Sequence, residues 1–84
     1  MEAKEEKILH GLKAGHFLLS VHAAQRMKQR SVTVADIRAC AGSAKCCRFH
    51  AQNGTWRIEG EDIDGETLTV ICALDSDIVI VTIF

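Results

Sequence analysis

The spacing of apolar residues changes once along this chain, and the change limits the folds open to it. Up to about residue 42, apolar side chains recur at helical intervals, as Ile8 and Leu12 do. From residue 45 onward they alternate, so that Cys47 and Phe49 share one face of a strand. Helices followed by strands predict an α+β fold, with the N-terminal helices packed on one face of a four-stranded antiparallel sheet.

With 84 residues, the chain is long enough for one domain and too short for two. We expect a single domain over 1–84 with three parts: an N-terminal helix within 1–15, a two-helix element over 20–42 and an antiparallel meander over 45–84. The first helix is expected from Glu2 to Lys13, with Gly15 as its stop. The run from His16 to Leu19 remains open between a brief strand and the lead into the next helix.

The two-helix element carries its own start signals. Ser20 is the expected N-cap of a helix that runs to about Gln29. Thr33 is the expected N-cap of the next helix, and Asp36, three residues later, suits a capping box. That helix is expected to end at about Ala41.

Turn residues divide the rest of the chain into strands. Asn53-Gly54 predicts a hairpin with a two-residue turn, which would pair His50 with Arg57 and Arg48 with Glu59. Strands are expected over 55–61, 67–74 and 78–84. The last of these, IVIVTIF, is apolar on both faces and is therefore typical of a central strand.

Charge is divided unevenly along the chain, although the net charge is only −1. Residues 7–57 hold nine Lys or Arg and one acid, whereas 58–84 hold seven acids and no base. Such polarity suggests an anionic ligand for one surface. The alternative is that acids collect in the C-terminal turns because turns are solvated.

One set of candidate residues lies on the first helix of the two-helix element. His22, Arg26 and Arg30 recur every four residues, so they form a stripe about 12 Å long. Two guanidiniums on a rigid helix suit phosphate or carboxylate, and a neutral imidazole beside them can accept a proton. The alternative is a solvated helix face, or arginines that pair with acids elsewhere.

The second set lies on the hairpin. Arg48, His50 and Arg57 are expected on one face of adjacent strands, as a set that handles phosphate. The alternative is a surface ion pair between Arg48 and Glu59. Trp56 is expected in the core rather than as a base-stacking platform.

Other chemistries are not indicated. Cys46 and Cys47 are adjacent and point to opposite faces of a strand, and no Cys-x-x-Cys pair exists, so no metal site or cofactor is expected. No disulfide framework, signal peptide or membrane span is evident, and we expect a cytoplasmic protein.

The two-helix element contains the motif Ser20-x-His22-Ala23-x-x-Arg26-Met27-x-x-Arg30, followed by Val32-Thr33-x-x-Asp36-Ile37. In this motif the sequence resembles a small bacterial and archaeal domain family of unknown function, numbered 4258. Weaker matches follow at Trp56-Arg57-Ile58-x-Gly60, Asp64-Gly65 and Ile80-Val81-Thr82.

The resemblance implies a fold related to the RelE, BrnT and MqsR-like toxins, which cleave messenger RNA without a metal, and a partner antitoxin. By motif position, the resemblance points to His22, Arg26, Arg30, Arg57 and Thr82. With the basic residues of the helix and the hairpin added, the expected catalytic set is His22, Arg26, Arg30, Arg57 and His50, in which His22 or His50 is the base. The expected substrate contacts are Arg48, Lys28 and Thr82. We therefore expect an RNA-cleaving toxin that meets RNA or the ribosome. The alternatives are a non-catalytic module that binds an anion or a protein, and a homodimer formed through an exposed sheet edge.

Overall fold

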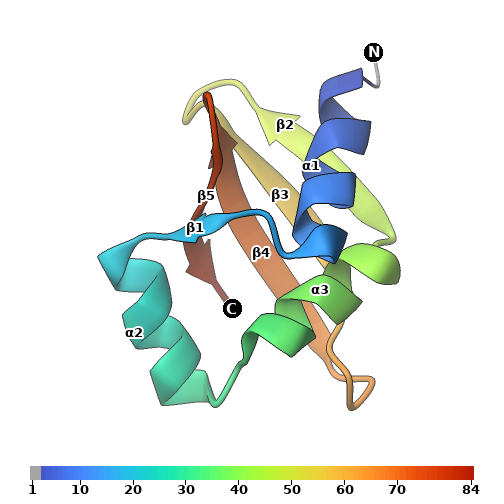
Figure 1. The fold of residues 1–84 in the computed structure, drawn as a ribbon, viewed down its shortest axis with the longest axis vertical. Helices are drawn as coiled ribbons and strands as arrows, with labels where there is room; N and C mark the ends of the chain where they lie inside the picture. The colour runs from blue at the N-terminus through green and yellow to red at the C-terminus, as the bar shows by residue number, and fades with distance from the viewer. Residues whose placement is uncertain (1–2) are drawn as a thin grey trace.

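The computed structural model describes residues 3–84, which form three helices and one five-stranded sheet (Figure 1). The helices are α1 (Ala3–Ala14), α2 (Val21–Arg30) and α3 (Val34–Gly42). The strands are β1 (Leu18–Leu19), β2 (Cys46–His50), β3 (Thr55–Glu61), β4 (Thr67–Leu74) and β5 (Ile78–Ile83). The α+β class is confirmed, and the predicted helix start at Glu2 lies outside the described residues.

The sheet has the order β1-β5-β4-β3-β2 and is mixed rather than purely antiparallel. Strands β2 to β5 form the predicted meander, but β1 adds a fifth strand that pairs parallel to β5. The prediction of four antiparallel strands was therefore wrong in this detail. A two-residue strand is too short to show alternation, and it forms here because β5 offers it a free edge. As predicted, β5 is a central strand.

The hairpin between β2 and β3 has a longer loop than the sequence predicted. Its loop comprises residues 51–54, and the register pairs His50 with Thr55 and Arg48 with Arg57. A two-residue type I′ turn needs positive φ at both central residues, and only Gly54 has it here (φ 65°). The predicted pairs of His50 with Arg57 and Arg48 with Glu59 were therefore wrong. The shift is two residues, so each side chain keeps its predicted face.

A bulge in β5 decides which of its residues face outward. Ile71 pairs with Thr82 but the next residue, Cys72, pairs with Ile80, so β5 carries one extra residue between these pairs. Ile80 and Ile83 are both buried, three positions apart instead of two. The bulge therefore turns Thr82 away from the core.

The caps of α2 and α3 match the sequence predictions. The Ser20 hydroxyl accepts a hydrogen bond from the Ala23 amide at 3.0 Å, and it also donates to the Val81 carbonyl of β5 at 2.9 Å. Thr33 and Asp36 form the predicted capping box. Ser20 therefore both starts α2 and ties that helix to the sheet.

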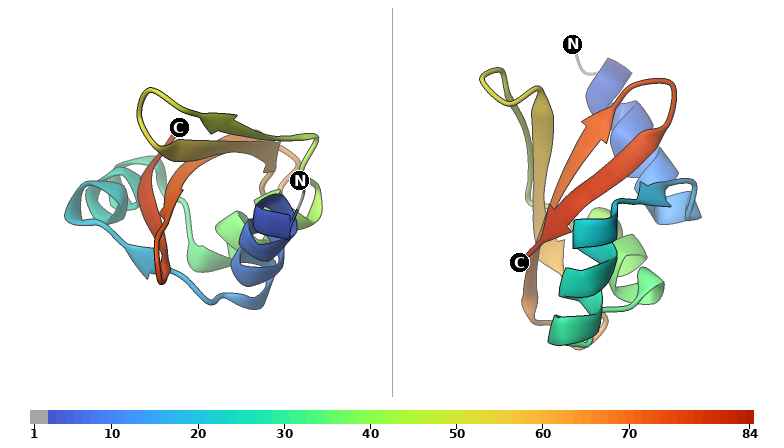
Figure 2. Two further views of the ribbon diagram at one scale, coloured as in Figure 1. Left: turned by 90° about the horizontal axis from the view of Figure 1, so that it is seen from above. Right: turned by 90° about the vertical axis from the view of Figure 1, so that its left-hand side faces the viewer.

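The helices α1 and α3 lie within the curve of the sheet (Figure 2). Between them and the strands lies the hydrophobic core, which includes Ile8, Leu12, Ile37, Ile58, Val70 and Ile80. Helix α2 lies alongside β5, beyond the end of β1 (Figure 1). No described helix covers the outer side of the β2–β3 hairpin (Figure 2). We call the side of the sheet that faces away from α1 and α3 the open face.

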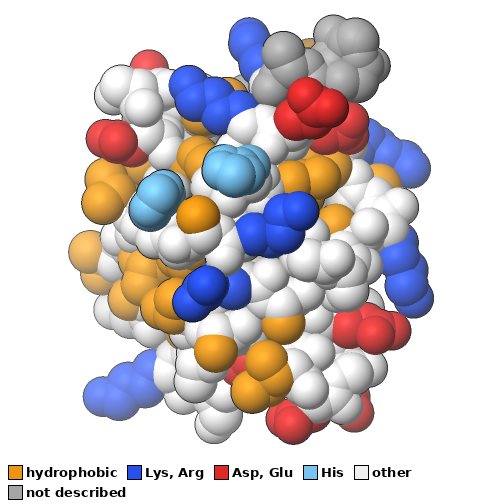
Figure 3. Space-filling view, turned by 45° about the vertical axis from the view of Figure 1, so that its right-hand side comes forward, with side chains coloured by type: hydrophobic (Ala, Val, Ile, Leu, Met, Phe, Trp, Pro, Cys, Tyr) orange, Lys and Arg blue, Asp and Glu red, His pale blue; other side chains and the backbone are white. Residues whose placement is uncertain are grey.

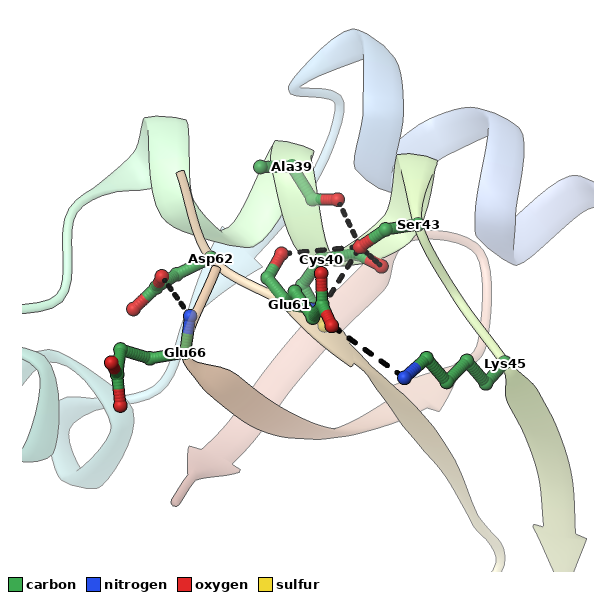
Figure 4. A network of polar contacts seen from close by, with 7 residues as sticks. All are labelled: Ala39, Cys40, Ser43, Lys45, Glu61, Asp62 and Glu66. Carbon is green, nitrogen blue, oxygen red and sulfur yellow. Dashed lines mark hydrogen bonds and ion pairs between the residues drawn. The ribbon is translucent and has the colours of Figure 1, made fainter. Parts of the chain in front are cut away.

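Helix α3 approaches β3 very closely at Gly60. A side chain at Gly60 would overlap the Cys40 carbonyl oxygen. Next to this contact, the Ser43 hydroxyl accepts from the Glu61 amide at 2.9 Å and lies 2.9 Å from the Ala39 carbonyl (Figure 4). The C-terminal end of α3 is thereby fixed to the sheet.

The lengths of the helices bear on membrane insertion. The longest, α1, has 12 residues, whereas about 20 apolar residues are needed to cross a bilayer. None of the helices within residues 3–84 meets the length and apolarity that a membrane span needs.

Candidate functional site

The basic side chains of the hairpin meet on the open face. Arg48 of β2 lies directly opposite Arg57 of β3 in the strand register. They line a hollow of about 290 Å³ together with Cys46, His50 and Glu59. The second predicted set, Arg48, His50 and Arg57, is therefore brought together, although through different pairs from those expected.

Arg57 makes two contacts that hold its guanidinium in place. Its Nε donates to the Glu59 carboxylate at 2.7 Å, and its Cζ lies 5.3 Å from the centre of the Phe84 ring. The acid in this hollow thus pairs with Arg57, not with Arg48 as the alternative prediction had it. Arg57 and Glu59 are two residues apart on one strand, so their shared face was readable from the sequence. The position of Phe84 beside Arg57 could not be predicted from the sequence, because it depends on the bulge in β5.

The stripe on α2 has one half-buried member and two exposed members. Arg26 is half-buried, and its Nε donates to the Ile83 carbonyl at 3.4 Å. His22 and Arg30, one turn to either side, are exposed. Within residues 3–84, neither makes an ion pair with an acid. Lys28 is also exposed, but it is two residues from Arg26 and so projects from another side of the helix.

The two predicted sets are linked across the sheet. Arg48, Arg57, Ile71 and Thr82 occupy successive strands in one register row. The Thr82 hydroxyl lies 3.5 Å from the Ile83 carbonyl, the same oxygen that Arg26 contacts. The basic band is our name for the polar residues of this row, Arg48, Arg57 and Thr82, together with His50 and Arg26. His50 lies two residues from Arg48 on the same face of β2, and Arg26 reaches the Ile83 carbonyl from α2. With strands about 4.8 Å apart, the row from β2 to β5 is roughly 14 Å long.

Comparison with known proteins identifies the family. The sequence model of one family, described as Domain of unknown function (DUF4258), matches residues 19–84. The chain belongs to the DUF4258 family. No curated protein and no solved structure gives a match. The DUF4258 region begins just before α2 and includes the whole basic band, while α1 lies outside it.

The acids of this DUF4258 domain do not form one acidic face. Asp62, Asp64 and Glu66 lie in the β3–β4 turn. There Asp62 accepts from the Glu66 amide at 2.9 Å (Figure 4) and from the Asp64 amide at the same distance. Asp75 and Asp77 lie in the β4–β5 turn, at the other end of β4. Much of the charge division along the sequence therefore reflects solvated turns, as the alternative prediction held.

Cys40 and Cys72 of the DUF4258 domain are packing residues of the core. Burial raises the pKa of the Cys40 thiol to about 11 and that of the Cys72 thiol to about 12. Both thiols are therefore protonated and poorly nucleophilic near neutral pH. Cys46 and Cys47 point to opposite faces, as predicted: Cys46 lines the hollow on the open face and Cys47 packs against the core.

A second hollow lies on the helix side of the DUF4258 chain and was not foreseen from the sequence. Its volume is about 270 Å³, and it is lined by residues of α1, of the segment between α1 and β1, and of the β4–β5 turn region, including Lys7, His10, His16 and Asp77. Figure 3 shows two histidines near each other on the face that carries α1. This hollow has one lysine for one carboxylate, whereas the hollow on the open face has two arginines for one carboxylate, so the second hollow is less suited to a phosphate.

Proposed function

We propose that this DUF4258 protein is a RelE/BrnT-like toxin component that binds single-stranded RNA on the basic band and cleaves it without a metal ion. The observation that carries the proposal is the pair Arg48–Arg57 on an uncovered sheet surface, with His50 beside it. Like charges placed directly opposite each other repel, so a bound anion between them relieves the repulsion. Phosphate suits such a pair because guanidinium binds it through paired hydrogen bonds.

The single carboxylate in the hollow, that of Glu59, is compatible with phosphate binding by the two arginines. The side chains of Arg57 and Glu59 are 35% and 41% exposed. A surface ion pair of this kind contributes roughly 0–1 kcal/mol, so a phosphate can displace the carboxylate at small cost. The Phe84 ring would keep the guanidinium in position during the exchange.

Cleavage would use the ribose itself as the nucleophile. His50 would accept the proton of the 2′-hydroxyl, the 2′-oxygen would bond to phosphorus, and the bond from phosphorus to the 5′-oxygen would break. Water or the imidazolium would protonate the departing 5′-oxygen. Arg48 and Arg57 would stabilise the charge on the phosphorane. His50 suits this role better than His22 does, because His50 lines the hollow that holds both arginines.

An RNA cleavage assay in the presence of a chelator tests the proposal. We expect wild-type protein to leave 2′,3′-cyclic phosphate ends on single-stranded RNA. His50→Ala is expected to lower the cleavage rate roughly 10²- to 10⁴-fold while RNA binding persists. Arg57→Ala should weaken both binding and cleavage.

Two matched variants serve as controls. His22→Ala removes an exposed histidine outside the hollow, and Arg38→Ala removes an exposed arginine from α3, on the far side of the sheet. Both should cleave as the wild type does. If the wild type leaves RNA intact but binds it through Arg48 and Arg57, the alternative of a non-catalytic anion-binding module replaces the nuclease. If it binds no RNA, the proposed nuclease and any RNA-binding role of the basic band both fail.

The toxin role has a test of its own in a bacterial host. Expression of the wild type should arrest growth and degrade messenger RNA, and Arg48→Ala/Arg57→Ala should not. A protein encoded beside it, supplied together with the toxin, should restore growth if it is the antitoxin. Equal growth with wild type and double variant would contradict the toxin role.

A further inference from the structure

The helix side of the β2–β3 hairpin carries an aromatic pair. Phe49 and Trp56 are partners in the strand register, and their ring centres lie 5.1 Å apart with planes tilted by 49°. Trp56 is half-buried against the core, whereas Phe49 is 50% exposed. The pair therefore has one fixed member and one accessible member.

The aromatic pair borders an open hollow of about 280 Å³. Its other lining residues are Lys4, Gly54 and Leu74. The position that a side chain of residue 54 would occupy is open space, because no described atom beyond the two chain neighbours of Gly54 lies within 4 Å of it. Among the residues that the structure describes, the lining combines two aromatic rings with one cation and no acid, which suits a flat aromatic group of an anionic ligand.

The hollow and the basic band are formed by neighbouring residues of the same strand, β2. Phe49 lies between Arg48 and His50 in β2, and successive side chains of a strand point to opposite faces. Strand β2 is an edge strand, and its outer edge has no strand beside it within the described sheet. A flexible single strand that passes around this edge can place a phosphate on one side and a base on the other.

We infer that the hollow beside Phe49 and Trp56 is a nucleobase-binding subsite for the RNA strand whose phosphates occupy the basic band. The inference rests on the proposed function and adds a second set of contacts to it. Bases stack on aromatic side chains with little regard to sequence, and loss of one such stack weakens binding roughly 5- to 150-fold. The subsite therefore favours nucleic acid over anions that lack bases.

Intrinsic fluorescence gives a direct test, because Trp56 is the sole tryptophan and the chain has no tyrosine. Full-length protein is titrated with a short oligoadenylate and, separately, with inorganic polyphosphate, which offers anions without bases. We expect oligoadenylate to quench Trp56 emission strongly and polyphosphate to bind with little quenching. Affinities for both are measured in parallel by calorimetry.

Variants at Phe49 and Arg48 separate the two sets of contacts. Phe49→Ala should weaken oligoadenylate binding at least fivefold and leave polyphosphate binding unchanged. Phe49→Leu, which keeps apolar volume and guards against misfolding, should behave in the same way. Arg48→Ala should weaken both ligands.

The outcomes separate this inference from the function on which it rests. If both ligands bind through Arg48 but quench Trp56 equally, or if Phe49→Ala leaves oligoadenylate binding unchanged, the nucleobase subsite is wrong and the basic band stands. If neither ligand binds, the proposed function fails and the subsite fails with it.

Discussion

Asp36 is buried although it is charged, and its carboxylate joins α3 to the β3–β4 turn. It accepts from the Thr33 amide at 2.8 Å, from the Thr33 hydroxyl at 3.0 Å and from the Ile63 amide at 3.2 Å. The hydrogen bond from the Thr33 amide is the main cause that lowers the pKa of Asp36, and burial acts in the opposite direction. The charged form is therefore the one that the fold stabilises.

Replacing Asp36 by Asn is expected to lower stability and to flatten its dependence on pH. The folded pKa lies below the unfolded value near 3.9, so the stabilisation is complete above that value and is lost as pH falls through the folded pKa. We expect a loss of about 1 kcal/mol at pH 7, since Asn keeps an acceptor but not the charge. Urea unfolding at pH 7 and pH 3 measures both effects.

The control for this variant is Asp75→Asn, at an exposed turn position. It should leave the free energy of unfolding nearly unchanged at both pH values. If Asp36→Asn and wild type lost the same stability between pH 7 and pH 3, the role assigned to the carboxylate would be wrong.

The residues that cap the helices could be predicted from the sequence. Ser20, Thr33 and Asp36 were predicted as caps, and the structure confirms each of them. Caps depend on residues within one helical turn, so a local pattern is enough to reveal them.

The strands show which features a local sequence pattern predicts and which it does not. Alternation predicted β3 and β4 with their observed bounds and placed Arg48, His50 and Arg57 on one face. The pairing across the hairpin was missed because it depends on loop backbone angles, which Asn53-Gly54 suggested wrongly. Strand β1 and the β5 bulge depend on tertiary contacts, so the meeting of Arg26 with Thr82 was not predictable.

The close approach of α3 to β3 leads to a prediction about Gly60. A methyl group there would meet the backbone of Cys40, which cannot move aside without shifting the helix. We expect Gly60→Ala to cost roughly 1–3 kcal/mol and to lower the melting temperature by at least about 4 °C. Thermal unfolding followed by circular dichroism measures the change.

Gly42→Ala is the matched control, because Gly42 is helical and an added methyl would meet only the Lys13 side chain at 4.0 Å. It should be neutral or slightly stabilising, since Ala favours helix over Gly. Equal melting temperatures for the two variants would contradict the tight contact at Gly60.

The proposed function requires a protein with a net charge of −1 to bind an anionic ligand. Only the local density of cations matters, because charges separated by more than about 10 Å are screened at 0.1 M salt. The affinity for single-stranded RNA should fall steeply with salt. Each lost phosphate contact should reduce the slope of log affinity against log salt concentration by about 0.7.

Arg48→Ala is therefore expected to lower that slope by about 0.7, whereas Arg38→Ala should leave it unchanged. The two variants remove the same charge from opposite sides of the sheet, so they separate a local from a global effect. Fluorescence anisotropy over a series of salt concentrations measures both slopes. Equal slopes for the two variants would show that net charge, not the basic band, governs binding.

The position of Arg48 also bears on whether two copies of the chain can associate through their edges. Arg48 is the middle residue of the five in β2, so a symmetric antiparallel pairing of two β2 edges would place it opposite its own copy. Two facing cations disfavour that pairing, and a monomer is expected in dilute solution. Arg48→Thr should therefore raise the fraction of dimer in sedimentation experiments, and an unchanged fraction would contradict this role. The side chain proposed to hold RNA would then also keep the protein from aggregating.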